Sequence, residues 1–216
     1  KTNTTFGFDT AVSFATECID RLHSTAQSHH RVIVVEVMGR YAGWIALHSG
    51  IAADAHCILL PEIQVELGRV VEKINEREAY GRLYSIVVVA EGTAINGKGR
   101  SLAAEAEAGG VERLGGIGAR VAQMLHDRTG KDTRTVVLGH LLRGGTPTAF
   151  DRLAATRFGT AAVRAIAAGK SGVMVALAFP NVNYVPLDQV AGRMKLVPLD
   201  GDTLQAGRDM GICFGD

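Results

Sequence analysis

The sequence has 216 residues, of which 47% are hydrophobic and 21% charged, with a formal net charge of +1. These values are typical of a folded globular protein and give no basis for a nucleic-acid or other polyanionic partner. No apolar run is long enough to cross a bilayer and no signal-peptide pattern is present, so we predict a cytoplasmic protein without a membrane partner.

The first predicted element is a helix over 8–27, where apolar side chains recur at helical spacing and Asp9 caps the start. Later elements alternate between strands at 31–37, 57–60, 85–90, 134–139 and 172–178 and helices at 42–53, 66–79, around 109–129 and 148–168. Few clear elements follow residue 180. This alternation predicts an α/β fold with a layered, mostly parallel sheet flanked by helices.

Three cysteines, Cys18, Cys57 and Cys213, are scattered along the chain. They form neither a metal-binding spacing nor an even-numbered disulfide set. We therefore predict structural thiols in a reducing compartment.

Polar residues gather where the predicted strands end, which is the edge at which ligands bind in open α/β sheets. The positions are Met38, Gly39, Arg40, Glu91, His140 and Arg143, and two further arginines, Arg31 and Arg134, stand where strands begin. An arginine fork suits phosphate, a carboxylate suits hydroxyl groups, and glycine admits a ligand close to the backbone. Together they predict a site for a phosphorylated polyol or sugar. Taken one by one, the same residues also fit turn glycines, solvated charges and a core histidine.

Familiar catalytic patterns are absent from the sequence. It contains neither a phosphate-binding P-loop nor a dinucleotide fingerprint, and no serine stands in a nucleophile elbow. Spacing alone therefore identifies no general base and no metal ligand.

Four segments, TFGFDTAV, SHHRVIVVEVMGRYAGWIAL, VVVAEG and TRTVVLGHLLRGGTPTAFDR, resemble the 6-phosphofructokinase family in that order and spacing. The resemblance covers residues 2–178 and is closest to the bacterial enzymes that use ATP or diphosphate. It implies a phosphotransferase of glycolysis, which transfers a phosphoryl group to the 1-hydroxyl of fructose 6-phosphate and gives fructose 1,6-bisphosphate, with Mg²⁺.

The resemblance also implies roles for the residues at the strand ends. Met38, Gly39 and Arg40 match the sugar-binding turn, where the arginine also faces the phosphoryl group in transfer and is thus catalytic. Glu91 matches the carboxylate that holds sugar hydroxyls.

Four more residues match positions around the 6-phosphate of the sugar. His140 and Arg143 match the pair that grips the sugar and this phosphate. Arg31 and Arg134 match arginines that a neighbouring subunit supplies to the same phosphate. The resemblance therefore implies self-association, as a homodimer or homotetramer with shared active sites.

The resemblance covers about the C-terminal two-thirds of a family subunit. The segments that hold the catalytic base, the phosphoryl donor and the Mg²⁺ ligands are expected before residue 1, so we expect the fragment alone to be inactive and its donor to stay undetermined. Residues 1–140 are expected to be mainly a small sugar-phosphate domain, 141–180 to return into a donor-binding domain, and 181–216 to form a C-terminal segment.

One further expectation concerns regulation, and another concerns an alternative function. The positions that match the family's effector site, His23, His56, Tyr80, Arg82 and Leu83, fit its pattern poorly, so simple nucleotide allostery is not predicted. A non-catalytic, sugar-phosphate-binding or regulatory half of a phosphofructokinase-like oligomer is the alternative function.

Overall fold

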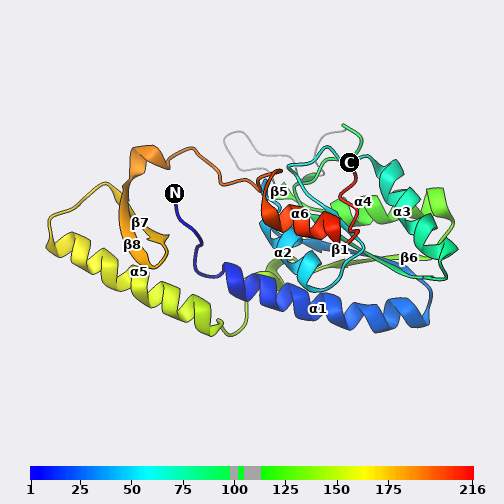
Figure 1. The fold of residues 1–216 in the computed structure, drawn as a ribbon, viewed down its shortest axis with the longest axis horizontal. Helices are drawn as coiled ribbons and strands as arrows, with labels where there is room; N and C mark the ends of the chain where they lie inside the picture. The colour runs from blue at the N-terminus through cyan, green and yellow to red at the C-terminus, as the bar shows by residue number, and fades with distance from the viewer. Residues whose placement is uncertain (98–101, 105–112) are drawn as a thin grey trace. The chain divides into compact units, whose positions relative to one another are not determined.

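A computed structural model describes residues 1–97, 102–104 and 113–216 (Figure 1). The chain forms two compact units, each built from two separate segments. We call Val12–Leu142 with Leu196–Asp216 the sheet unit, and Lys1–Ala11 with Arg143–Lys195 the hairpin unit. Each unit is described by itself.

The sheet unit is built on four parallel strands in the order β2-β3-β1-β6. The strands are β2 (Cys57–Leu59), β3 (Ser85–Ala90), β1 (Val32–Val37) and β6 (Thr133–Val137). Every residue of β1 and β3 is buried, as expected for central strands with helices on both faces. The predicted fold class, a mostly parallel sheet flanked by helices, is confirmed.

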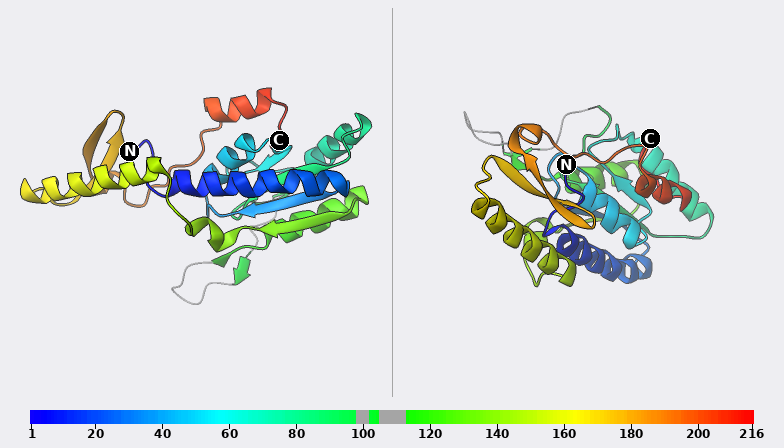
Figure 2. Two further views of the ribbon diagram at one scale, coloured as in Figure 1. Left: turned by 90° about the horizontal axis from the view of Figure 1, so that it is seen from below. Right: turned by 60° about the vertical axis from the view of Figure 1, so that its left-hand side comes forward.

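The two faces of this sheet pack against different helices, which Figures 1 and 2 show from three sides. Helices α3 (Leu67–Ala79) and α4 (Ile117–Thr129) share one apolar cluster with Val32 and Val34 of β1. On the opposite face, Gly50 of α2 (Trp44–Ala52) lies so close to Ile58 that a Cβ atom there would be 2.6 Å from the isoleucine side chain. The chain end adds α6 (Asp202–Asp209), whose Gly207 packs near Ile51 of α2.

One charged residue lies within the buried strand β1. Glu36 is only 4% exposed, and its carboxylate accepts hydrogen bonds from the backbone N–H groups of Gly116 (3.3 Å) and Gly118 (2.8 Å). These groups belong to the start of α4, where N–H groups lack partners within the helix and favour a negative charge. Glu36 therefore fixes the start of α4 on the sheet.

The hairpin unit consists of one long helix and a two-stranded antiparallel sheet. Helix α5 (Ala149–Ala167) begins at Thr148, whose hydroxyl accepts from the N–H of Asp151 (3.3 Å) and donates to Asp9 (2.6 Å). Strands β7 (Val173–Ala178) and β8 (Asn181–Pro186) pair along their full length. The hydroxyl of Tyr184 on β8 donates to the carbonyl of Ala161 on α5 (2.8 Å), which joins hairpin and helix.

Several predicted element boundaries differ from the structure. The strand predicted at 172–178 was expected to belong to the parallel sheet. It corresponds to β7, which pairs antiparallel with β8 because only two residues connect the two strands. The helix predicted around 109–129 starts at Ile117. A short strand, β5 (Arg113–Leu114), precedes it and pairs with β4 (Leu102–Ala104). The part of the prediction over 109–112 lies outside the described residues. Strand 134–139 ends at Val137 and continues as a 3₁₀ helix, Gly139–Arg143.

Helix α1 (Phe8–Ser28) matches the first predicted helix, and a second 3₁₀ helix spans Leu187–Gln189. Within the described ranges, no helix combines the length and the apolar character needed to span a membrane.

An aromatic cluster of the buried His56 and the half-buried His23 and Tyr84 lies where β2 and β3 begin. The rings of His23, His56 and Tyr84 meet edge to face, with centroids 5.4–5.9 Å apart. Nδ1 of His56 accepts a hydrogen bond from the N–H of Ile86 (2.8 Å). Burial, and then the positive charge of Arg77, lowers the pKa of His56 from 6.5 to about 3. His56 is therefore neutral in the folded protein at pH 7.

We predict that His56 makes the fold acid-sensitive. Because its folded pKa is lower than its unfolded pKa, the unfolded chain binds the proton first as the pH falls. The stabilisation is complete above pH 6.5 and is lost progressively towards pH 3, with a slope of up to about 1.4 kcal/mol per pH unit. Urea unfolding followed by circular dichroism at several pH values measures this slope.

The matched variants are His56→Asn, whose amide oxygen can still accept from Ile86, and His29→Asn at an exposed histidine. The first is expected to flatten the slope between pH 6.5 and 4, whereas the second leaves it unchanged. Equal slopes in the wild type and His56→Asn contradict the assignment.

Candidate functional site

The end of β1 forms a tight turn at the carboxyl edge of the sheet. The backbone N–H of Ala42 donates to the carbonyl of Gly39 (3.1 Å). A Cβ atom on Gly39 would lie 2.4 Å from the carbonyl oxygen of Ala42, so only glycine fits there. The next residue, Arg40, has a φ of +51°, which is unfavourable for a residue with a side chain. Other contacts must therefore hold the turn in place.

Those contacts come from the end of the neighbouring strand β3. Oε1 of Glu91 accepts hydrogen bonds from the backbone N–H groups of Gly39 (3.2 Å) and Arg40 (2.8 Å). Gly92 faces the carbonyl of Arg40, where a Cβ atom would be only 1.7 Å from the oxygen. Among the described residues, both of these hydrogen bonds end on the same oxygen, Oε1 of Glu91. The carboxylate and the glycine together fix the backbone from which the Arg40 side chain extends.

A second carboxylate at this edge was missed by the sequence analysis. Glu62 follows β2, and both its oxygens accept from the N–H of Gly43, at 3.0 and 3.1 Å, where α2 begins. Oε1 also accepts from the N–H of Val197 in the C-terminal segment (2.9 Å). The sequence could have indicated Glu62 as a site residue, because it comes directly after strand 57–60 and Pro61 and so places an acidic residue at a third strand end. Its hydrogen bonds give it a structural role at the edge of the site.

Five of the eight predicted site residues lie at the carboxyl edge of the sheet unit. The Arg40 side chain is exposed, and its guanidinium carbon lies 5.6 Å from the centroid of the Tyr41 ring. His140 is also exposed, on the 3₁₀ helix that follows β6. The five residues are Met38, Gly39, Arg40, Glu91 and His140. Arg143 ends the same 3₁₀ helix and is the first residue of the second segment of the hairpin unit.

The other two predicted residues lie at the opposite, amino edge of the sheet. Arg31 and Arg134 share one carboxylate: Nε of Arg31 lies 2.5 Å from Oδ2 of Asp132, and Nη1 of Arg134 lies 2.8 Å from Oδ1. The hydrogen bond from Arg31 lowers the pKa of Asp132. Two cations and one anion leave a net positive charge, and the two arginine side chains are 28% and 58% exposed. Within one sheet unit this pair lies at the far end of the strands from Arg40.

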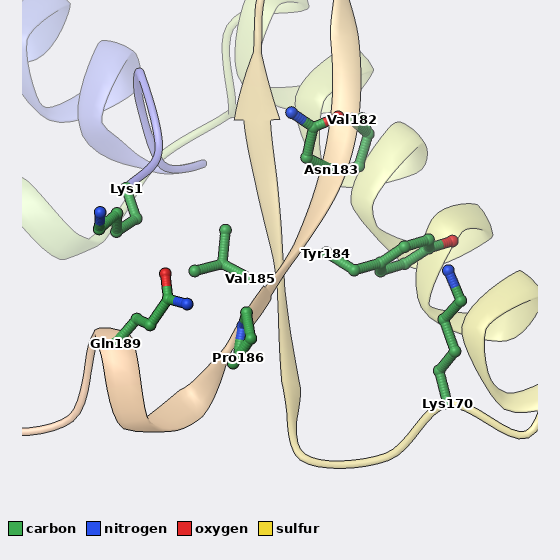
Figure 3. Close-up of a pocket in the computed structure, with 8 residues that line it drawn as sticks. All are labelled: Lys1, Lys170, Val182, Asn183, Tyr184, Val185, Pro186 and Gln189. Carbon is green, nitrogen blue, oxygen red and sulfur yellow. The ribbon is translucent and has the colours of Figure 1, made fainter.

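Among the described residues, neither a candidate metal centre nor the pocket beside Tyr184 includes these site residues. Over residues 1–97, 102–104 and 113–216, no three His, Cys, Asp or Glu side chains are close enough to hold a metal ion. A pocket of about 450 Å³ lies in the hairpin unit, where Figure 3 shows the Lys170 side chain beside the ring of Tyr184, 4.5 Å from its centroid. None of the eight predicted residues lines it.

Comparison with known proteins gives a consistent family assignment. The family model described as Phosphofructokinase matches residues 1–166. The chain is 51% identical to an ATP-dependent 6-phosphofructokinase of Chloroflexus aggregans over 100% of its own length and 59% of that protein. It is 54% identical to a pyrophosphate–fructose 6-phosphate 1-phosphotransferase of Amycolatopsis mediterranei over 92% of its length and 58% of that protein.

Solved structures show the same fold. A phosphofructokinase of Pichia pastoris in the T-state is 31% identical, with a TM-score of 0.72 over 97% of this chain and 22% of that one. A pyrophosphate-dependent phosphofructokinase from Marinobacter aquaeolei shares the fold at 24% identity, with a TM-score of 0.74 over 95% of this chain and 55% of that one. The chain thus spans less than two thirds of the length of the proteins that it matches.

Proposed function

Because this chain belongs to the phosphofructokinase family, we propose that it forms the sugar-phosphate side of a site that transfers a phosphoryl group to the 1-hydroxyl of fructose 6-phosphate. The observation that carries the proposal is the turn at Gly39 and Arg40, held by two hydrogen bonds to Glu91. It places an exposed arginine and a carboxylate at the edge of the sheet where ligands bind in this class of fold.

In this site Arg40 is the catalytic residue. During phosphoryl transfer, negative charge is spread over the oxygens of the moving group and the attacking hydroxyl. A fixed guanidinium beside those oxygens stabilises the transition state because its orientation is set before the reaction. The fixed backbone of the turn supplies that preorganisation.

Glu91 and His140 bind the sugar. The Glu91 carboxylate accepts hydrogen bonds from sugar hydroxyls, and the half-buried Met38 lines the same turn. His140 and Arg143 lie on one 3₁₀ helix and bind the sugar and its 6-phosphate. Arginine is suited to this role because its planar fork can bind phosphate through two hydrogen bonds.

Arg31 and Arg134 bind the 6-phosphate of a neighbouring subunit, so the active protein is a homodimer or homotetramer with shared sites. Their position at the amino edge supports this arrangement, since they are remote from Arg40 of the same sheet unit. The net positive charge left beside Asp132 is available to an anion. Residues 1–140 would then supply most of the sugar-phosphate site, and 141–180 would lead into the donor-binding part.

The donor is ATP or diphosphate, since relatives of similar identity are named for each. Mg²⁺ belongs to the family's reaction, but the described residues offer no ligand set for it.

The test is a chimera in which this chain replaces the aligned part of the Chloroflexus aggregans relative, hereafter the Chloroflexus chimera. We expect turnover that depends on fructose 6-phosphate with ATP or with diphosphate, and none with fructose, which lacks the phosphate. Isothermal calorimetry with fructose 6-phosphate provides a second measurement. A folded chimera that binds the sugar phosphate without turnover supports the non-catalytic alternative, and one that does not bind it contradicts the proposed site.

A further inference from the structure

The end of the chain lies along the edge strand β2 and brings two cysteines opposite each other. Cys213 pairs with Cys57 in a parallel β-bridge. The N–H of Ile58 donates to the carbonyl of Cys213 (2.9 Å), and the N–H of Cys213 donates to the carbonyl of His56 (3.1 Å). These bonds fix the register, so the two cysteines are direct cross-strand neighbours although 155 positions of sequence separate them in the chain.

This pairing suits a disulfide without movement of the backbone. Adjacent strands lie about 4.7–4.9 Å apart, and disulfides join Cα atoms about 4.4–6.8 Å apart. Side chains of directly opposite residues emerge on the same face of a sheet. Cys57 and Cys213 therefore meet the requirement on the distance between Cα atoms, whereas the sequence alone placed them in no disulfide set.

The surroundings make one of the two thiols the entry point for an oxidant. Cys57 is fully buried, whereas Cys213 is partly exposed. The Nζ atom of Lys73 on α3 reaches within 4.0 Å of the Cβ position at Gly211, two residues before Cys213. The hydrogen bond from Cys57 is the main cause that lowers the pKa of Cys213, and a backbone N–H at Gly215 lowers it further. A thiolate is the reactive form of cysteine.

We propose that Cys57 and Cys213 form a redox-active dithiol that a hydroperoxide converts to an intramolecular disulfide. The Cys213 sulfur attacks the peroxide, the O–O bond breaks, and a sulfenic acid and an alcohol (or water, from hydrogen peroxide) result. The Cys57 sulfur then attacks the sulfenic sulfur, the S–S bond forms and water leaves. The two thiols together lose two electrons and two protons, and the peroxide gains them.

The disulfide would attach the C-terminal segment covalently to the sheet. At present this segment reaches the carboxyl edge through the hydrogen bond from Val197 to Glu62, the residue that also binds the start of α2. Oxidation would add a covalent link between this segment and β2, the strand that Glu62 follows. The inference is independent of the proposed catalytic role, since neither cysteine belongs to the sugar-phosphate residues.

The experiment treats the folded 216-residue chain with hydrogen peroxide, alkylates the remaining thiols and maps the tryptic peptides. The three cysteines fall on separate peptides, 2–21, 41–69 and 209–216. We expect a link between 41–69 and 209–216 with a mass lower by two hydrogen atoms, reversed by dithiothreitol, while Cys18 is alkylated. Cys18→Ser is the matched control and should form the same link; Cys213→Ser should leave Cys57 reduced.

Thermal unfolding provides a second readout. Because the link closes a long loop, oxidation should raise the Tm of the wild type and of Cys18→Ser by at least about 5 °C, and not that of Cys213→Ser. The proposal is overturned if Cys213 gains oxygen or stays reduced without linking to Cys57. A link that forms only in urea, or one that involves Cys18, also overturns it.

Discussion

Replacing Arg40 by alanine in the Chloroflexus chimera is expected to lower kcat by at least about tenfold, because loss of one preorganised charge donor costs about 2–4 kcal/mol of transition-state stabilisation. In the proposed mechanism the guanidinium acts on charge that develops during transfer. The effect should therefore fall mainly on kcat, with a smaller change in KM for fructose 6-phosphate. Steady-state kinetics with saturating donor measure both.

The positive φ of Arg40 requires a control for backbone effects. Arg40→Gly removes the side chain and also removes the strain, whereas Arg40→Asn keeps a polar residue that tolerates φ near +50°. If charge is the cause, all three variants lose activity to a similar extent. Arg69→Ala, at an exposed arginine of α3, should leave kcat unchanged. A normal kcat in Arg40→Gly limits Arg40 to a role in turn geometry.

Replacing Arg134 by alanine is expected to raise KM for fructose 6-phosphate by roughly 10- to 150-fold, which corresponds to about 1.5–3 kcal/mol for one charge-assisted contact with phosphate. The decisive experiment mixes the Arg134→Ala and Arg40→Ala chimeras under conditions that allow subunits to exchange. If each site combines residues of two subunits, some hybrid sites contain only wild-type residues. Part of the activity should then return.

Asp132 distinguishes phosphate binding from a purely structural ion pair. If Arg134 only pairs with Asp132, Asp132→Ala should change KM for fructose 6-phosphate as much as Arg134→Ala does. That change should correspond to less than about 1 kcal/mol, because the ion pair is exposed. If Arg134 binds phosphate, removal of Asp132 frees the guanidinium and does not raise KM. Confirmed subunit exchange without recovery of activity would falsify the shared site.

The parts of the fold that sequence predicted best are those with the strongest apolar patterns. The strands at 32–37 and 85–90 and the helix from Phe8 are confirmed because long valine-rich or helically spaced runs leave few alternatives. The edge strands β7 and β8 were harder to predict. Their antiparallel pairing depends on a two-residue connection, and β8 carries no continuous apolar run.

The site shows the same division between local and long-range information. The residues at strand ends could be located because each follows its own strand directly. Two other contacts depend on residues from other strands or segments. Glu91 binds the backbone of the turn after a different strand, and Glu62 joins the start of α2 to Val197 near the chain end. The pairing of Cys57 with Cys213 likewise depends on where the chain end returns to the sheet. No spacing rule within one segment contains such information.

The double use of Glu91 limits how this site can be redesigned. One oxygen fixes the backbone that carries Arg40, while the same carboxylate is proposed to bind the sugar. An engineer who shortens or removes this side chain also loosens the turn that carries Arg40, the residue proposed to act on the phosphoryl group. If the proposed roles hold, selectivity for the sugar and speed of transfer are tied to one side chain, and variants with a new substrate preference need a compensating change that supports the turn from another direction.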